Sequence, residues 1–129
     1  MIFRQLQDPE TSTYTYIVGD EETRQAVLID PVLEQADRDR TAVEELGLNL
    51  ALTLETHVHA DHVTGAGELR RATGCRVGVP AVAGLECADL AVREGETISV
   101  GNLRLEPLFT PGHTDVDHCY VAGDRVFTG

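Results

Sequence analysis

The histidines of this chain gather in two short segments. All five fall within them, at positions 57, 59, 62, 113 and 118. The first segment also contains Asp61, so that it reads His-x-His-x-Asp-His over residues 57–62. Imidazole and carboxylate groups are good ligands for Zn²⁺, Fe²⁺ and Mn²⁺, and a short loop can supply several of them with little loss of entropy. This spacing predicts a metal site that includes His57, His59, Asp61 and His62.

The second segment has the same layout as the first. Residues 110–114 read Thr-Pro-Gly-His-Thr, which places His113 behind an apolar strand and a Pro-Gly turn. The first segment also follows an apolar strand directly. Loops at the ends of strands converge where a sheet builds its binding sites. We therefore expect the two segments to supply histidines to one metal centre.

The pattern around the other residues near these segments gives weaker evidence for a role in metal binding. His118 precedes a strand, and we interpret it as structural rather than as a ligand. Asp115 and Asp117 are expected to be solvated loop carboxylates, although either could accept the second N–H of a ligand histidine. Cys119 fits a buried strand position better than a soft metal ligand. Asp30, at a strand end, is either a turn former or a partner of a ligand.

The strand before the first histidine segment has the clearest pattern in the chain. Leucines alternate with other residues at positions 48, 50, 52 and 54, which predicts a strand with one leucine face in the core. Gly65 and Gly67 allow a tight entry into the next element. We expect that element to be a helix over residues 65–73 that ends at Gly74.

The remaining elements suggest a mixed sheet with helices on its outside. A hairpin is expected over residues 14–18 and 26–29, ended by Asp30-Pro31, and an outer helix over 34–46. Further strands are expected at 76–79, 96–100, 103–109, 119–122 and 125–128, with a poorly patterned stretch over 80–91. This order predicts the α+β class.

Length and composition narrow the function classes. The 129 residues suit one domain, and 42% hydrophobic with 25% charged residues is ordinary globular composition. The net charge of −12 disfavours nucleic acids and anionic membrane surfaces as partners. The sequence shows neither a membrane span nor the apolar stretch of a signal peptide. Its three cysteines form no Cys-x-x-Cys pair, so we expect a reducing, cytoplasmic location.

Three stretches resemble the metallo-β-lactamase superfamily. They are Glu-Thr-His-Val-His-Ala-Asp-His-Val-Thr from Glu55 with the glycines behind it, Phe-Thr-Pro-Gly-His-Thr from Phe109, and Val-Phe-Thr-Gly from Val126. Within the superfamily the chain looks most like the persulfide dioxygenases, which are related to glyoxalase II. Ala60 favours this branch, because members like glyoxalase II usually carry a bulkier residue there.

The resemblance implies a fold and a set of ligands. The fold would be an αβ/βα sandwich, of which residues 1–129 form the first half as a single domain. The metal would be one Fe(II), held by His57, His113 and the aspartate of a Phe-Thr-Gly-Asp motif. His59, Asp61 and His62 would surround it, whereas in dinuclear hydrolases of the superfamily they bind metal directly. No catalytic residue beyond the metal centre, and no separate cofactor-binding residue, is implied.

The resemblance also implies a reaction, with two alternatives. The first expectation is an enzyme that uses O₂ to oxidise glutathione persulfide, or another thiol derivative of glutathione, to sulfite and glutathione. The second is a hydroxyacylglutathione hydrolase like glyoxalase II, with one or two zinc ions. The third is a catalytically silent fragment that acts as an interaction module.

The printed sequence ends at Phe127-Thr128-Gly129, one residue before the aspartate of the motif. We therefore expect an N-terminal fragment that lacks the second half of the sandwich and much of its glutathione-binding surface. A last strand without neighbours on its outer edge would invite pairing with another chain, so a homo-oligomer through this edge is also expected.

Overall fold

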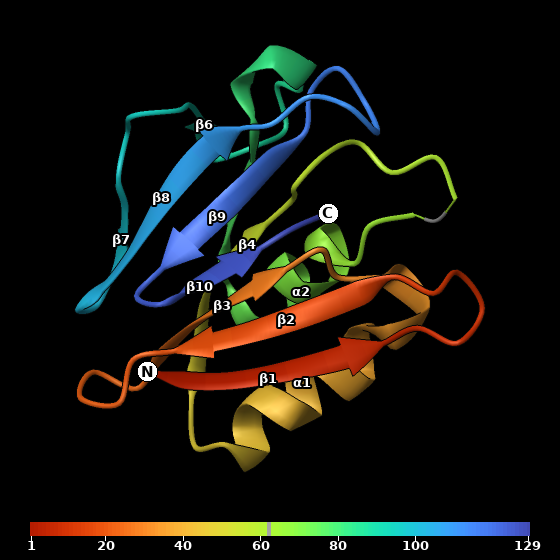
Figure 1. Cartoon of the computed structure of the whole chain (residues 1–129). Coiled ribbons are helices and arrows are strands. Elements are labelled where there is room, and N and C mark those ends of the chain that lie inside the picture. Colours follow the sequence, from red (N-terminus) through yellow and green to blue (C-terminus); the bar gives the residue numbers. More distant parts are fainter. Residues whose placement is uncertain (62) are drawn as a thin grey trace.

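Ten strands pair into two sheets in residues 1–61 and 63–129, the part of the chain that the computed structural model describes (Figure 1). The larger sheet contains, in order, β1 (Ile2–Gln7), β2 (Tyr14–Gly19), β3 (Gln25–Ile29), β4 (Asn49–Leu54), β5 (Arg76–Pro80) and β6 (Leu90–Val92). The smaller sheet has the order β10 (Arg125–Phe127), β9 (His118–Ala122), β8 (Leu103–Phe109) and β7 (Ile98–Val100).

The helices connect the parallel strands of the larger sheet. The first three strands pair antiparallel, whereas β3, β4, β5 and β6 pair parallel. A parallel pair needs a crossover, and α1 (Ala36–Glu45) and α2 (Ala66–Thr73) supply those between β3, β4 and β5. Short 3₁₀ turns lie at Leu33–Gln35 and Ala81–Ala83. The expected mixed sheet with outer helices is confirmed.

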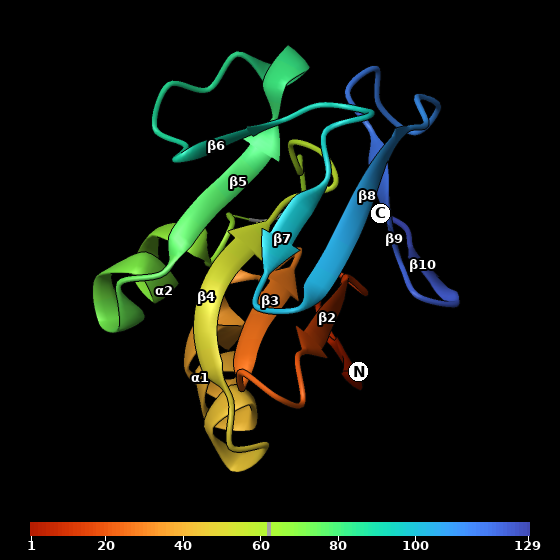
Figure 2. The same ribbon diagram turned by 90° about the vertical axis from the view of Figure 1, so that its left-hand side faces the viewer.

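Two apolar cores lie on opposite faces of the larger sheet. Between the two sheets, Val27, Leu105 and Tyr120 are fully buried together. On the other face, Leu28 and Leu69 pack beside residues of α1. Figure 2 shows the helices behind the larger sheet, with β7 and β8 in front of it. The ends of β4 and β8, where the histidine loops begin, lie close together, because His118 pairs with Phe109 of β8 and donates its N–H to the carbonyl of Thr56 after β4.

The expectation of a single leucine face on β4 is wrong. Leu48 and Leu50 pack toward the helices, whereas Leu52 and Leu54 face the smaller sheet. The cause is a shift in register, because Ala26 pairs with Leu50 but the next residue pairs with Leu52. The extra residue, Ala51, forms a bulge, and a slip of one residue exchanges the two faces of a strand.

The other expected elements are confirmed with small shifts in their ends. The second helix ends at Gly74, which has the left-handed φ of 75° expected of a glycine that terminates a helix. The sequence reading missed β1, and it missed β6, whose three residues are too few to show alternation. The helices within residues 1–61 and 63–129 lack the length and the hydrophobicity of a membrane span.

Asp20 ties the larger sheet to the smaller one. Its carboxylate accepts a hydrogen bond from Thr23 Oγ1 at 2.5 Å and one from the backbone N–H of Asn102, in the β7–β8 turn, at 2.7 Å. The neighbouring Gly101 has a φ of 58°, and a Cβ there would collide with the Thr23 hydroxyl. This turn therefore needs glycine so that the carboxylate can reach both sheets.

This contact predicts a specific loss of stability in acid. The hydrogen bond from Thr23 and that from Asn102 lower the pKa of Asp20 from 3.8 to about 2. Because the folded pKa lies below the unfolded one, the stabilisation is complete above about pH 4 and is lost as the pH falls toward 2. Urea unfolding between pH 5 and pH 2 should show a shallower pH dependence for Asp20→Asn than for the wild type. The exposed Asp124→Asn is the control, and identical slopes in all three proteins would contradict the assignment.

Candidate metal centre

Asp30 anchors the first histidine loop. It follows β3, is buried, and has a φ of 54°, which is unusual for a residue with a side chain. Its Oδ1 accepts the backbone N–H of Thr56 at 2.7 Å, and its Oδ2 accepts the Thr56 hydroxyl at 2.7 Å. Its own N–H donates to the carbonyl of Leu54 at 2.8 Å. The ends of β3 and β4 are thus fixed to each other directly below the histidines.

Thr56 in turn sets the state of His57. Its single hydroxyl proton goes to Asp30, so the Thr56 oxygen must accept a hydrogen bond from His57 Nδ1–H, at 2.8 Å. The proton on Nδ1 leaves the other ring nitrogen, Nε2, with a free lone pair. Burial, together with the nearby His59, lowers the pKa of His57. The lowered pKa favours the neutral imidazole that a metal ion requires, and the Thr56 contact favours its Nδ1–H tautomer.

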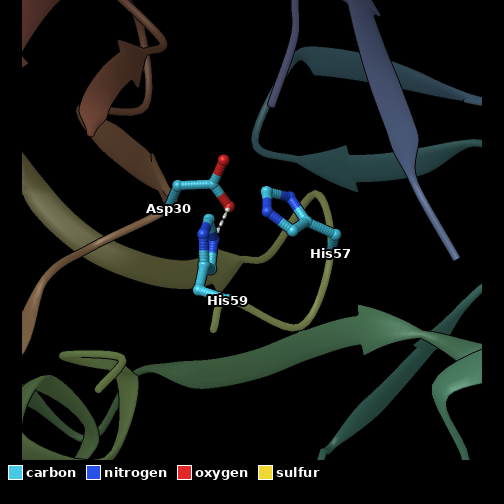
Figure 3. A group of neighbouring side chains, drawn as sticks. All are labelled: Asp30, His57 and His59. Carbon is cyan, nitrogen blue, oxygen red and sulfur yellow. Dashed lines mark hydrogen bonds and ion pairs between the residues drawn. The ribbon is translucent and has the colours of Figure 1, made fainter. Parts of the chain in front are cut away.

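His59 lies between two acidic side chains. Its Nε2 is 3.1 Å from Asp30 Oδ1 and 3.3 Å from Glu55 Oε2 (Figure 3 shows the first of these). Burial alone would lower the pKa of His59, but the hydrogen bonds and negative charges of Asp30 and Glu55 raise it to about 10. Burial also raises the pKa of Glu55. The buried carboxylates therefore favour a positive charge at this point of the loop.

The structure brings three of the histidines together. The ring centroids of His57 and His59 are 4.0 Å apart, and those of His57 and His113 are 5.0 Å apart at an interplanar angle of 90°. Asp30, His57 and His59 each offer a ligand atom within 4.8 Å of the others. Asp61 lines a cleft together with His57, His59 and His113. His62 lies outside the described residues. The two histidine loops meet as the sequence predicted. Which of these side chains bind a metal ion stays a prediction.

This donor set fits a transition metal ion. Imidazole and carboxylate together suit Fe²⁺ and Zn²⁺. Two acceptor oxygens next to the histidines, Glu55 Oε2 and Asp117 Oδ1, are buried, and among the described residues each has only a long contact of 3.3 Å with a histidine nitrogen in place of a well-aligned hydrogen bond. Unsatisfied buried acceptors are costly, and a nearby positive charge offsets that cost. The residues present can therefore hold a cation.

A cleft of about 410 Å³ opens over these residues. Its lining includes five hydroxyl-bearing residues of the β1–β2 loop and of β2, which are Thr11, Ser12, Thr13, Tyr14 and Tyr16. Hydroxyl groups both donate and accept hydrogen bonds, so this lining suits a polar substrate. The sequence reading missed these residues, although their density of hydroxyl groups is visible in the sequence.

The second histidine loop is fastened to the first. The backbone N–H of His118 donates to the carbonyl of Thr56 at 2.8 Å. The His118 ring is buried, with Nδ1 2.9 Å from the carbonyl of Val116, which supports its structural interpretation. Asp115 is exposed as expected. Asp117 is buried and not solvated, and its Oδ1 lies 3.3 Å from His57 Nδ1, in line with the alternative that it accepts an N–H of a ligand histidine. Cys119 is only half-buried.

Comparison with known proteins fits this geometry. Residues 8–129 match the family model described as the metallo-beta-lactamase superfamily. The chain belongs to this superfamily. The chain is 46% identical to "Persulfide dioxygenase ETHE1, mitochondrial" of Mus musculus over 132 residues, which cover all of this chain and 52% of the mouse protein. The crystal structure of ETHE1 from Myxococcus xanthus superimposes with a TM-score of 0.95 at 58% identity, covering 99% of this chain and 56% of that one.

The chain is also similar to a hydrolase. The hydroxyacylglutathione hydrolase of Rhodopseudomonas palustris is 39% identical to this chain, over 86% of the chain and 44% of the hydrolase. The chain spans about half the length of the curated relatives that it matches. The metallo-β-lactamase fold expected from the sequence is thereby confirmed, and so is the expectation that the chain corresponds to about half of it.

Replacing Asp30 tests its anchoring role. In Asp30→Asn one oxygen becomes an amide donor, so Thr56 loses either the acceptor of its N–H or that of its hydroxyl. Because a buried group without its partner costs 1–3 kcal/mol, we expect the free energy of unfolding to fall by about 2 kcal/mol. Urea denaturation measures it, with the exposed Asp37→Asn as a matched control. Equal stability of the two variants would show that Asp30 does not anchor the loop.

Proposed function

We propose that this chain supplies the metal-binding histidines of an iron-dependent persulfide dioxygenase. The observation that carries the proposal is the meeting of His57, His59 and His113 above Asp30, in a chain 46% identical to the mouse persulfide dioxygenase. In this proposal His57 and His113 hold Fe(II), and His59, Asp61 and His62 surround it. The iron would supply open coordination positions for O₂ and for the substrate sulfur.

The residues of the chain have distinct tasks in this proposal. Asp30 and Thr56 hold the proton of His57 on Nδ1, so that Nε2 of the neutral ring is free. The hydroxyl groups of the cleft offer partners to the peptide groups of glutathione. The overall reaction balances as GSS⁻ + O₂ + H₂O → GSH + SO₃²⁻ + H⁺. The outer sulfur of the persulfide is oxidised, O₂ is reduced, and glutathione leaves as the thiol.

The location and the partners of the protein are part of the same proposal. We propose residues 1–129 as one domain in the cytoplasm, with small-molecule partners and neither nucleic acid nor membrane among them. The word "mitochondrial" stands in the name of the mouse relative and describes that protein. Pairing between copies of the chain would use the outer edge of β10, which pairs only with β9 among the described strands.

A glutathione thioesterase is the second candidate. The similarity to the hydroxyacylglutathione hydrolase of Rhodopseudomonas palustris supports it. All five residues that a site with two zinc ions would use, His57, His59, Asp61, His62 and His113, are present in the sequence. In that case a metal-bound hydroxide would attack the thioester carbonyl. A silent interaction module is the third candidate, and it would show neither activity.

One set of assays separates the three candidates. The chain is loaded anaerobically with Fe²⁺, and O₂ uptake and sulfite formation are then followed with glutathione persulfide. Hydrolysis of an acylglutathione is measured with zinc-loaded protein. O₂ uptake that is coupled to sulfite supports the dioxygenase. Hydrolysis without O₂ uptake overturns it in favour of the thioesterase, and no turnover with either substrate overturns both in favour of the module.

Replacement of the proposed ligands should remove the metal. We expect His57→Ala and His113→Ala to weaken Fe²⁺ affinity by roughly tenfold or more, since even changes to the partners of ligands cost 10–100-fold. His118→Gln is the matched control, because its ring is turned to the carbonyl of Val116. Competition with a chromophoric chelator under anaerobic conditions gives the affinities. Unchanged affinity in His113→Ala would remove the second histidine loop from the site.

A further inference from the structure

Asp117 lies where the two histidine loops meet. It precedes β9 and is only 8% exposed. Its backbone carbonyl accepts the N–H of Thr110 at 2.9 Å, which closes the loop that carries His113. The next residue, His118, donates its N–H to the carbonyl of Thr56 in the first loop. The Asp117 side chain is therefore held between both loops by backbone contacts on either side.

The two carboxylate oxygens of Asp117 face different loops. Oδ2 accepts the backbone N–H of Thr114, directly after His113, at 2.6 Å. Oδ1 is 3.3 Å from Nδ1 of His57 and accepts no hydrogen bond by strict geometry among the described residues. The second loop is thus shaped by one oxygen, while the other oxygen presents negative charge to the histidine of the first loop.

The proton on His57 explains why this charge is favourable. The hydroxyl proton of Thr56 is donated to Asp30, so the hydrogen between Thr56 Oγ1 and His57 belongs to Nδ1. Nδ1–H therefore points at the region between Thr56 Oγ1, at 2.8 Å, and Asp117 Oδ1, at 3.3 Å. A carboxylate in this position attracts the N–H dipole and disfavours the tautomer in which Nδ1 is bare.

We propose that Asp117 is a positioning residue that holds His57 in its Nδ1–H tautomer and couples this histidine to the loop of His113. It acts through His57 and does not itself contact the reacting groups. The inference rests on the proposed role of His57 as a metal ligand. Neither the family match nor the similar proteins assign this role to Asp117.

Asparagine is the discriminating replacement at this position. Its amide oxygen must face the N–H of Thr114, since an NH₂ group there would oppose another donor. Its NH₂ group is then turned toward His57 Nδ1, where it opposes the Nδ1–H of the wild type. Asp117→Asn therefore keeps the shape of the second loop but favours a bare Nδ1. That tautomer carries its proton on Nε2, where the lone pair for the metal should be.

The experiment measures the tautomer and the metal affinity separately. Long-range ¹H–¹⁵N correlation spectra of the metal-free chain distinguish Nδ1–H from Nε2–H histidine. We expect Nδ1–H for His57 in the wild type and a loss of this form in Asp117→Asn. Zn²⁺ affinity, measured by competition with a chromophoric chelator, should fall by roughly tenfold in the variant. The matched control is Asp115→Asn, an exposed carboxylate of the same loop, which should change neither quantity.

Each outcome bears on the proposal. An Nε2–H tautomer of His57 in the wild type overturns it, and this measurement needs no variant to fold. If Asp117→Asn behaves like Asp115→Asn in tautomer and in Zn²⁺ affinity, the proposal is also wrong. If the tautomer shifts as expected while the wild type binds no Zn²⁺, the positioning of His57 stands and the proposed metal function fails.

Discussion

The candidate site depends on one buried carboxylate, that of Asp30, and on the hydroxyl of Thr56. The hydroxyl can donate only one proton, and because Asp30 takes it, the oxygen is left to accept from His57. The same carboxylate accepts the Thr56 N–H and approaches His59. A single acidic group thus fixes the backbone of the loop, the proton of one histidine and the ring of another. This is an economical way to order a loop whose ligands must converge.

The charge of the loop explains why so many acidic groups can be buried at this point. Three almost fully buried carboxylates contact the histidines of the first loop, and these are Asp30, Glu55 and Asp117. Isolated carboxylates would be costly there, because burial penalises charge that is not paired. His59 offsets part of this cost, since its Nε2 lies close to both Asp30 and Glu55. A metal ion would compensate the remainder, so the acidic excess near the histidines is consistent with a cation site.

Local patterns in the sequence were enough to predict the histidine loops, but the groups that hold those loops were not predictable in this way. The histidines stand out by their type and spacing, and both loops follow strands that show clear alternation. Asp30 and Thr56 are 26 positions apart in the sequence. Their contact depends on the parallel pairing of β3 and β4, which brings Asp30 Oδ1 to 2.7 Å from the Thr56 nitrogen. Asp117 is buried only because its loop docks against Thr56 and His57. The bulge at Ala51 is another tertiary effect, since a strict alternation of leucines contains no sign of it.

The two histidine loops come from different sheets, and this has a thermodynamic consequence. His57 follows β4 of the larger sheet, and His113 follows β8 of the smaller one. An ion held by both would bridge the two layers of the sandwich, in the manner of a removable cross-link. Since the unfolded chain cannot keep the two loops together, each tenfold rise in free metal above the dissociation constant would add about 1.4 kcal/mol to the stability of the fold. Metal supply would then set not only how much of the protein is active, but also how much of it stays folded.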